Sequence, residues 1–342
     1  MNLLTQSRLS RDFELIPFST AKKRRRVFPN RAHWDSLPYL VLHAFKLFAS
    51  IIKHRPQVVY FKGTSDTGFL RDMTLMGVAR LLGKPVLCHL HGRPMGRLFA
   101  REKNAWRPLV AWGMGLAQET VTLSPGLAEE FRIMFPKASL TPIPNVVDTN
   151  RFKPMAENSS RGPLRVLTVG RLSREKGTWD LLQVGAKLKE LNIPVAFRLA
   201  GIGETEAEEN ALKTECGKLE LDVSFLGTVR GDDLVREYQR AQAFFLPTHA
   251  EIFPNVVLEA LASGLPVVTT NVPVIPEMFG AEEGYLTDPQ DIDAMVGALK
   301  TLATDDAKRK ALGQNARALA EANYGIDVAA NKLGSLLKKL GA

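Results

Sequence analysis

The feature that most constrains the fold of this chain is a regular alternation of short β-rich apolar runs with helical stretches, which occurs twice along its 342 residues. The first half favours strands at 14–18, 58–62, 85–89 and 119–124, with helices at 37–54, at 67–82 and after Met95. The second half favours strands at 164–169, 196–200, 224–227, 243–247 and 266–270, with helices that include 178–191 and about 327–340. Alternation at this spacing predicts parallel, doubly wound α/β sheets.

The length of the chain indicates two domains. With 45% hydrophobic and 24% charged residues, 342 residues are enough to bury two cores and too many for one ordinary domain. The prolines at positions 142, 144 and 154 mark a linker. We therefore expect a first domain at 1–150, a second domain at 151–325, and a final helical segment at 326–342.

Cysteine content and hydropathy bear on the compartment. Cys88 and Cys216 are the two cysteines, too few for a disulfide framework or a four-ligand zinc site, which favours a reducing cytoplasm. The long apolar stretch at 37–52 is interrupted by His43 and Lys46 and is too short to span a membrane. Residues 5–14 are polar, so no signal peptide is visible.

Positive charge is concentrated in the first half of the chain. Residues 1–150 contain 22 Lys and Arg against 10 Asp and Glu, a net charge of +12, which leaves −3 for the remainder of the total of +9. The densest basic run is 22–26, with Phe28, Arg31, Trp34 and Tyr39 nearby. This pattern suits docking on an anionic cytoplasmic membrane leaflet, where each cation contributes about 1 kcal/mol. A nuclear targeting run or a solvated loop are the alternatives, and no nucleic-acid-binding fold is recognisable.

Two glutamates define the first candidate motif. Glu251 and Glu259 are eight positions apart, and an apolar helix is expected at 256–263 with Asn255 as its N-cap and Gly264 at its end. Free backbone N–H groups and the helix dipole would then form an anion site between the two carboxylates. A phosphate site flanked by carboxylates suits a sugar nucleotide. A buried helix whose Glu259 only caps or pairs with a lysine fits the spacing about equally well.

Two cations define the second candidate motif. The expected strand at 164–169 ends at Gly170, and Arg171 and Lys176 follow before an amphipathic helix begins. Both cations thus lie at the carboxyl end of a strand, where open α/β sheets bind ligands. There they can hold a diphosphate and stabilise its charge as it leaves. The alternative is that they are ordinary solvated surface charges.

Together these motifs resemble those of the retaining, nucleotide-sugar-dependent glycosyltransferases of family 4, which have the GT-B fold. The matching segments are GRLSREKG at 170–177, EIFPNVVLEALASGLP at 251–266, TPIPNVVDTNRFKP at 141–154 and CHLHGRP at 88–94. The match runs from about residue 10 to the C-terminus. It implies two Rossmann-like domains that face each other across a cleft, with the final helix crossing back to the first domain.

The resemblance also implies roles for single residues. Glu251 would face the donor sugar, Glu259 would hold the ribose hydroxyls, and Arg171 and Lys176 would bind the diphosphate. The remaining expected substrate-binding residues are Phe253, Pro254, Asn255 and Val256. No cofactor or metal is expected, because the nucleotide sugar is a substrate and the cations carry the phosphate charge. Whether Glu251 acts as a nucleophile or as a stabiliser of same-face attack stays open.

His91 is the second expected catalytic residue. It follows the strand at 85–89, so its side chain is expected at the carboxyl end of that strand, in the interdomain cleft. The resemblance places it against the donor sugar or the reacting groups, with His89 as a weaker candidate on the same strand face. A lone histidine is more often a satisfied core or loop residue.

The sequence departs from the family pattern at three places. Ile252 and Val146 stand where small residues are usual, and a β-branched residue beside Glu251 restricts the backbone there, which bears on the choice of donor sugar. We also expect the first domain to lack its opening strand and glycine-rich loop, because residues 2–9 already resemble the helix that follows them. Either that strand is absent, or the chain starts at an internal methionine of a longer protein, in which case restoring it should raise stability and activity.

The motifs and the resemblance together predict a hexosyltransferase that moves a sugar from a UDP- or GDP-sugar to a lipid-linked or polysaccharide acceptor, and the resemblance implies retention of anomeric configuration. We expect it in the cytoplasm, peripherally attached to the inner face of the plasma membrane. The alternative is a catalytically impaired GT-B relative that binds a nucleotide or a partner as a subunit. Epimerisation of a sugar nucleotide is disfavoured because its acid and base groups are not evident.

Overall fold

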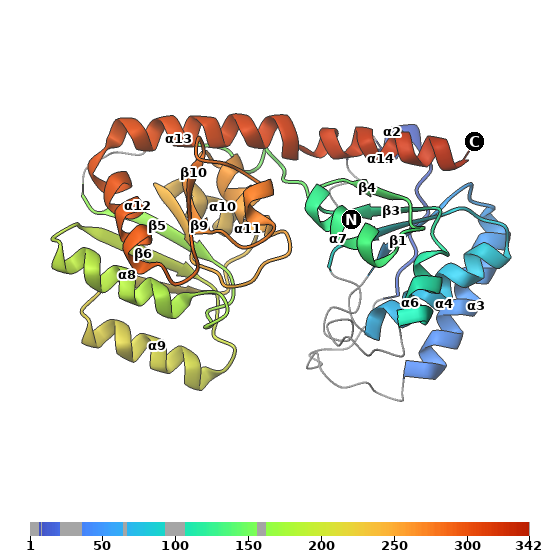
Figure 1. Ribbon diagram of the computed structural model, residues 1–342, viewed down its shortest axis with the longest axis horizontal. Helices are drawn as coiled ribbons and strands as arrows, with labels where there is room; N and C mark the ends of the chain where they lie inside the picture. The colour runs from blue at the N-terminus through green and yellow to red at the C-terminus, as the bar shows by residue number, and fades with distance from the viewer. Residues whose placement is uncertain are drawn as a thin grey trace. The chain divides into compact units, whose positions relative to one another are not determined.

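The chain divides into two compact units in the computed structural model, which describes residues 7, 9–20, 36–63, 67–92, 107–155 and 162–341 (Figure 1). The N-terminal unit comprises Met1–Pro144 together with Ala330–Ala342, and the C-terminal unit comprises Asn145–Ala329. The last helix, α14 (Ile326–Gly341), therefore begins in the C-terminal unit and contributes most of its length to the N-terminal unit.

A parallel sheet forms the centre of the N-terminal unit. Its described strands are β1 (Val59–Gly63), β2 (Val86–Leu90), β3 (Glu119–Thr122) and β4 (Leu140–Pro142), which pair in that order. The described helices are α2 (Leu9–Asp12), α3 (Ser36–His54), α4 (Thr67–Leu81), α6 (Arg107–Met114) and α7 (Pro125–Met134). Every residue of β2 and β3 is buried, as expected for strands covered on both faces.

The predicted strand at 14–18 is wrong. Residues 13–20 contain no regular secondary structure, and Leu15 and Ile16 are exposed. Pro17 cannot donate to a sheet ladder, and among the described strands β1 pairs only with β2. Most of the expected helix at 2–9 lies outside the described residues. The short helix α2 begins at Leu9, the last residue of that range.

A six-stranded parallel sheet forms the centre of the C-terminal unit. Its strands are β5 (Leu164–Val169), β6 (Val195–Ala200), β7 (Val223–Gly227), β8 (Ala243–Leu246), β9 (Val267–Thr270) and β10 (Gly284–Thr287). They pair in the order β10-β9-β8-β5-β6-β7. The chain thus moves outward from β5 to β7, returns to β8 and continues the other way. The strand order reverses between β5 and β8, which is where doubly wound sheets bind ligands.

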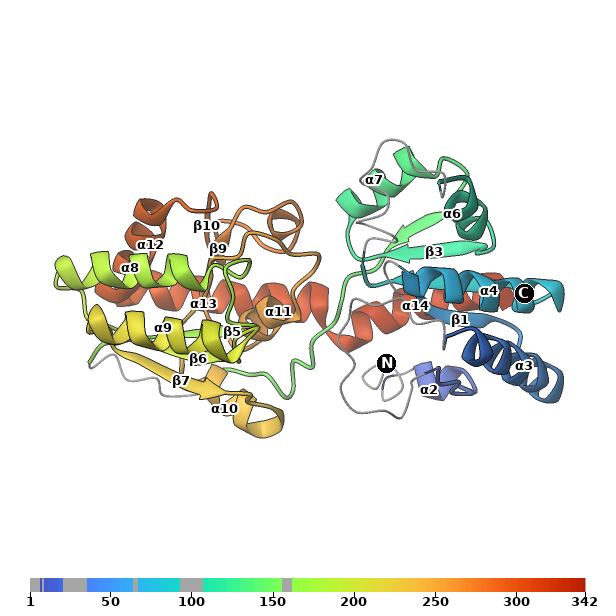
Figure 2. The ribbon, with the colours of Figure 1, turned by 90° about the horizontal axis from the view of Figure 1, so that it is seen from below.

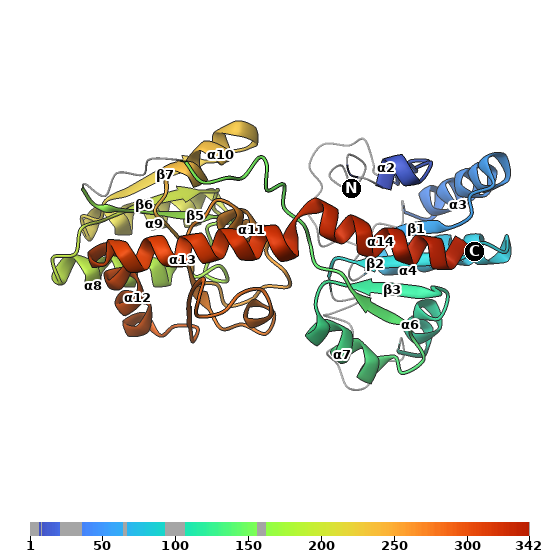
Figure 3. The same cartoon turned by 90° about the horizontal axis from the view of Figure 1, so that it is seen from above.

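Helices cover both faces of this sheet. They are α8 (Thr178–Glu190), α9 (Glu206–Lys218), α10 (Gly231–Arg240), α11 (Asn255–Ala262), α12 (Ile292–Thr304) and α13 (Asp306–Leu319). Helices α8 and α9 lie on one face (Figure 2), and α13 runs across the other (Figure 3). Strand β10 was missed from the sequence, where the last predicted strand is 266–270.

The core of the C-terminal unit follows from the apolar strands. Val166, Phe197, Leu199 and Phe245 are buried against the apolar faces of α8 and α12. Burial of each such side chain stabilises the fold by about 1.5–3 kcal/mol. Strand β5 pairs with both β6 and β8, so this core holds the carboxyl ends of β5 and β8 side by side.

Candidate functional site

Two loops meet at the carboxyl ends of β5 and β8. The phosphate loop, which we define as residues 170–177, connects β5 to α8, and the acidic loop, residues 247–254, connects β8 to α11. Gly177 has a φ of +69°, and a Cβ atom at this residue would lie 1.7 Å from the carbonyl oxygen of Pro247. Glycine is therefore required by the backbone conformation and by the close approach of the two loops.

Lys176 joins the two loops directly. Its Nζ lies 2.7 Å from Oε1 of Glu251 and donates a hydrogen bond to the carbonyl oxygen of Ala250 at 2.9 Å. The Lys176 and Glu251 side chains are only 23% and 15% exposed, so this ion pair is better shielded from solvent than a surface pair. The structure therefore brings together one expected diphosphate ligand and the expected sugar-facing carboxylate.

Arg171 has a different partner. Its Nη1 lies 2.9 Å from Oε1 of Glu204, in the segment between β6 and α9, and both side chains are exposed. A solvent-exposed pair of this kind contributes about 0–1 kcal/mol to stability. The Arg171 guanidinium can therefore exchange Glu204 for another anion at little cost.

Glu259 lies in the second turn of α11 and is held by a tyrosine. The hydroxyl of Tyr238, on α10, donates to Oε2 of Glu259 at 2.9 Å and also lies 3.1 Å from the carbonyl oxygen of Val256. Burial raises the pKa of Glu259 to about 7, although the Tyr238 hydrogen bond and the charge of Arg151 act in the opposite direction. Sequence reasoning missed Tyr238; its place on the buried stripe of α10 was detectable, but its partner was not.

Asn255 is not the N-cap of α11 as predicted. Pro254 occupies the capping position, with an extended backbone (φ −72°, ψ 115°) and no side-chain cap, and Asn255 is the first helical residue. Pro254 is buried, and Val256 is half-buried. Phe253 is buried against Tyr324, and its carbonyl oxygen accepts a hydrogen bond from Nδ2 of Asn145 at 3.2 Å.

His91 belongs to the N-terminal unit, directly after β2. Its ring stacks on that of His89, with centroids 4.3 Å apart and planes inclined by 20°. His89 is buried, and the hydroxyl of Tyr60 lies 2.8 Å from its Nδ1. Burial, followed by the charges of His91 and Lys62, lowers the pKa of His89 to about 3. The role of His91 toward a donor sugar stays a prediction.

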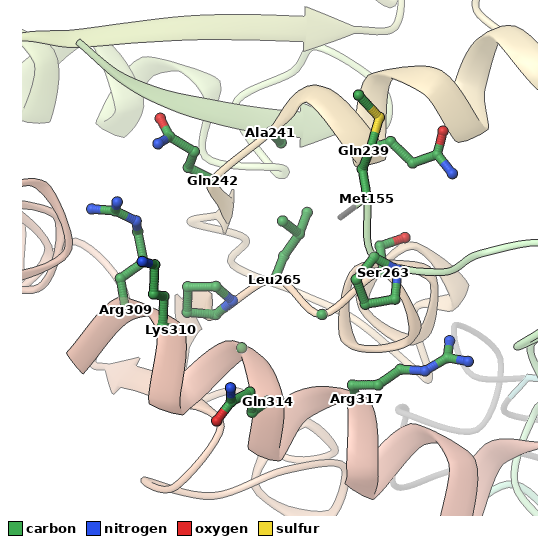
Figure 4. A pocket seen from close by; sticks show the side chains of 14 residues that line it. Met155, Gln239, Ala241, Gln242, Ser263, Leu265, Arg309, Lys310, Gln314 and Arg317 are labelled. Carbon is green, nitrogen blue, oxygen red and sulfur yellow. The ribbon is translucent and has the colours of Figure 1, made fainter. Parts of the chain in front are cut away.

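A separate cavity of about 430 Å³ lies at the opposite end of the C-terminal sheet (Figure 4). Gln242 and Pro266, which line it, precede β8 and β9, so the cavity lies at the amino ends of these strands. Arg317, which also lines it, donates to the carbonyl oxygens of Phe152 and Ala262. This cavity is therefore distinct from the two loops. Among the described residues, no group of three or more His, Cys, Asp or Glu side chains could hold a metal ion.

Comparison with known proteins identifies the family. The family model described as glycosyl transferases group 1 matches residues 150–319, which contain both the phosphate loop and the acidic loop. Through this unit the chain belongs to the group 1 glycosyl transferases. Because the matched region contains the Lys176–Glu251 pair and Glu259, the family assignment and the site geometry concern the same residues.

The chain aligns with only part of the length of its curated relatives. Glycogen synthase of Mycobacterium tuberculosis is 26% identical over 252 residues, 71% of this chain and 60% of the relative. A D-inositol 3-phosphate glycosyltransferase of Corynebacterium urealyticum is 31% identical over 221 residues, 60% of this chain and 52% of the relative. The putative colanic acid biosynthesis glycosyltransferase WcaL of Escherichia coli is 30% identical over 202 residues, 57% and 50% respectively. The chain thus aligns with between half and three-fifths of the length of these relatives.

Solved structures share the fold. Sucrose-phosphate synthase from Thermosynechococcus elongatus superimposes with a TM-score of 0.73 at 22% identity, covering 92% of this chain and 80% of that one. HepE of Anabaena, solved with UDP and glucose, gives a TM-score of 0.70 at 19% identity, covering 92% and 85%. These likenesses, with the two parallel sheets flanked by helices, confirm the predicted two-domain GT-B fold class.

Proposed function

We propose that this glycosyltransferase moves a hexosyl group from a UDP- or GDP-sugar to a saccharide or lipid-linked acceptor, with retention of anomeric configuration. The observation that carries the proposal is the Lys176–Glu251 pair at the carboxyl ends of β5 and β8, with Arg171 in the same loop and Glu259 on the adjoining helix. Cations that can bind a diphosphate thus lie beside a carboxylate that can face a sugar.

In the proposed reaction each charged group has one role, at the leaving diphosphate, at the sugar ring or at the ribose. The bond between the anomeric carbon and the diphosphate oxygen breaks, the acceptor hydroxyl oxygen bonds to the anomeric carbon on the same face of the sugar, and the hydroxyl proton passes to the leaving diphosphate. Arg171, Lys176 and the N-terminus of α11 stabilise the negative charge that develops on the leaving diphosphate. Glu251 stabilises the positive charge on the sugar ring, and the carboxylate of Glu259 accepts hydrogen bonds from the ribose hydroxyls.

The names of similar proteins support these substrate classes. WcaL and the amylovoran biosynthesis glycosyltransferase AmsK of Erwinia amylovora, 28% identical over 203 residues, are both named for polysaccharide synthesis. HepE has been solved with UDP-glucose as well as with UDP. A nucleotide sugar as donor and a saccharide as acceptor are the substrates that this chain is proposed to share with them.

The proposal predicts that Arg171→Ala and Lys176→Ala each weaken UDP or GDP binding about tenfold or more, because a hydrogen bond to a charged group contributes about 1.5–3 kcal/mol. Calorimetry with UDP and GDP measures the affinity, and release of nucleoside diphosphate from a panel of sugar nucleotides, with and without a lipid acceptor, measures turnover. The matched control is Lys187→Ala on α8, which removes an exposed ion pair between Lys187 and Asp293 of α12.

Unchanged nucleotide affinity in both loop variants would place the diphosphate elsewhere. Nucleotide binding by the unmodified protein without turnover of any donor in the panel would instead support the alternative, a GT-B relative that serves as a nucleotide-binding subunit. Loss of affinity together with donor turnover supports the transferase.

We also propose that the N-terminal unit binds an anionic membrane surface, because α3 carries a solvent-facing apolar stripe. Val41, Phe45, Phe48 and Ile52 recur at helical spacing and are 45–69% exposed, whereas Leu47 on the opposite face is buried. Helix α3 contains no Asp or Glu. No helix in the described part of the chain is long and apolar enough to cross a membrane, so α3 would lie in the plane of the interface.

We expect the unmodified protein to sediment with vesicles that contain anionic lipid, and high salt to release it because exposed charges are screened. Phe45→Ser with Ile52→Ser should abolish sedimentation, and Ile133→Ser, which removes an exposed apolar side chain on α7, should not. Replacement of the basic run at 22–26 by glutamine should also abolish it, although this run lies outside the described residues. Absent or salt-insensitive vesicle binding by the unmodified protein would contradict the proposal.

A further inference from the structure

A buried carboxylate adjoins the two loops and pairs with one side chain among the residues that the structure describes. Asp180 is the third residue of α8, directly after the phosphate loop, and is only 6% exposed. Its Oδ2 lies 2.6 Å from Nε2 of His249, in the acidic loop. The His249 side chain is 30% exposed, so the imidazole connects a buried helix terminus with the surface of the site.

The backbone links the same two segments. The backbone N–H of His249 donates to the carbonyl oxygen of Glu175 at 2.8 Å. His249 therefore contacts Glu175 near the end of the phosphate loop and Asp180 in the first turn of α8. Ala250 and Glu251, the next two residues, supply the two oxygen atoms that accept from Lys176. His249 thus lies two residues before Glu251 in the sequence, and Asp180 lies four residues after Lys176.

The remaining contacts of the acidic loop are weaker guides to its position. The Thr248 hydroxyl lies 3.0 Å from the carbonyl oxygen of Ala250 and 3.4 Å from that of Glu175, and the Thr248 carbonyl oxygen accepts from the hydroxyl of Thr270; these are hydrogen bonds between neutral groups. The close approach of Gly177 to Pro247 prevents the loops from moving closer but does not prevent them from separating. A hydrogen bond to an ionised carboxylate is about twice as strong as one between neutral groups, so the Asp180–His249 contact is the strongest tie that does not involve Lys176 itself.

We propose that Asp180 and His249 form a positioning pair, which holds the acidic loop on the N-terminus of α8 so that Lys176 and Glu251 keep the geometry that a nucleoside diphosphate sugar requires. The inference rests on the proposed function and adds two residues to its donor site. Neither residue needs to touch the substrate. His249 acts through the position of the acidic loop, whose Ala250 carbonyl oxygen holds the Lys176 ammonium. Asp180 acts through the orientation of the His249 ring, with the N-terminus of α8 favouring its negative charge.

The test uses the whole chain and three variants. His249→Ala removes the tie, whereas His249→Gln offers an amide N–H in place of the imidazole Nε2, and Asp180→Asn keeps an acceptor oxygen without the charge. We expect His249→Ala to weaken UDP and GDP binding about tenfold, which corresponds to about 1.4 kcal/mol. His249→Gln and Asp180→Asn should stay within about threefold of the unmodified protein. Hydrogen exchange in peptides covering 170–177 and 247–254 should rise in His249→Ala, with exchange in β5 and β8 unchanged.

Three outcomes would overturn the inference. Nucleotide affinity and loop exchange in His249→Ala equal to those of the unmodified protein would show that the tie is not needed. Equal losses in His249→Ala and His249→Gln would show that the imidazole itself contacts the ligand. Loss of affinity accompanied by raised exchange throughout the C-terminal sheet would show a general role in stability. Lys176→Ala, measured in parallel, separates the two proposals: normal affinity there contradicts the donor site itself, whereas lost affinity there with normal affinity in His249→Ala contradicts only the positioning pair.

Discussion

Replacement of Glu251 by alanine is expected to lower kcat about a hundredfold or more, which is the usual cost of removing one group that stabilises charge in a transition state. UDP or GDP affinity should stay the same or increase. The reason is the 2.7 Å contact between Lys176 and Glu251. Removal of the carboxylate leaves the Lys176 ammonium free to bind a diphosphate, while the positive charge that develops on the sugar loses its nearest proposed stabiliser.

Glu259→Ala should show the opposite pattern, with nucleotide affinity reduced because the ribose hydroxyls lose their acceptor. Calorimetry with UDP and GDP, together with single-turnover rates of diphosphate release, separates the two effects. Asp293→Ala, on the exposed side of the same unit, controls for a general loss of negative charge. Equal losses of nucleotide affinity in the Glu251 and Glu259 variants would contradict the division of roles.

The donor site was partly predictable because it depends on local rules. A strand, a glycine and two cations at 164–176 suffice to place Lys176 at the carboxyl end of β5, and the same reasoning places Glu251 after β8. What the sequence could not specify is that β5 and β8 are neighbours, since Lys176 and Glu251 are 75 positions apart. The contact follows from the return of the chain across the sheet, which is a property of the whole unit.

The errors also have local physical causes. Asn255 was expected to cap α11, but Pro254 directly before it has a fixed φ and takes the capping position. The run at 14–18 contains β-forming residues but also a proline, and no described strand pairs with it. The solvent-facing stripe of α3 was not predicted, because the spacing of apolar residues in a helix does not show which of them contact another element.

The partners of buried polar groups were out of reach for a different reason. Tyr238 and Glu259 are 21 positions apart, and Asp180 and His249 are 69 apart. Periodicity can place each residue on the buried side of its element. It cannot say which buried polar groups meet, because that depends on how α8, α10 and the acidic loop pack against the sheet.

Nucleotide binding is expected to strengthen as the pH rises from 6 to 8, because the pKa of Glu259 is raised to about 7 by burial. Below this pKa the side chain is protonated and offers the ribose hydroxyls a poorer acceptor, so affinity should fall by up to tenfold per pH unit. Tyr238→Phe removes a hydrogen bond that lowers the pKa of Glu259, and should therefore shift the midpoint of the pH dependence upward. Calorimetry with UDP across this range measures the midpoint, and a pH-independent affinity in the unmodified protein would contradict the assignment of Glu259 to the ribose.

Stability should show the opposite dependence on pH at the same residue. A carboxyl group with a pKa of about 7 in the folded state and an ordinary value of 4.5 in the unfolded state binds more protons when folded. Between these values the free energy of unfolding therefore falls as the pH rises, by about 3 kcal/mol from this group. Glu259→Gln removes the charge while its amide oxygen can still accept from Tyr238, so it should be markedly more stable than the unmodified protein at pH 8 and similar at pH 5. Denaturant unfolding at the two pH values measures the difference.

If Glu259→Gln gains stability at pH 8 while losing nucleotide affinity, then Glu259 is retained for ligand binding at the expense of the fold. If Glu259→Gln and the unmodified protein are equally stable at both pH values, the carboxylate is ionised in the folded protein throughout.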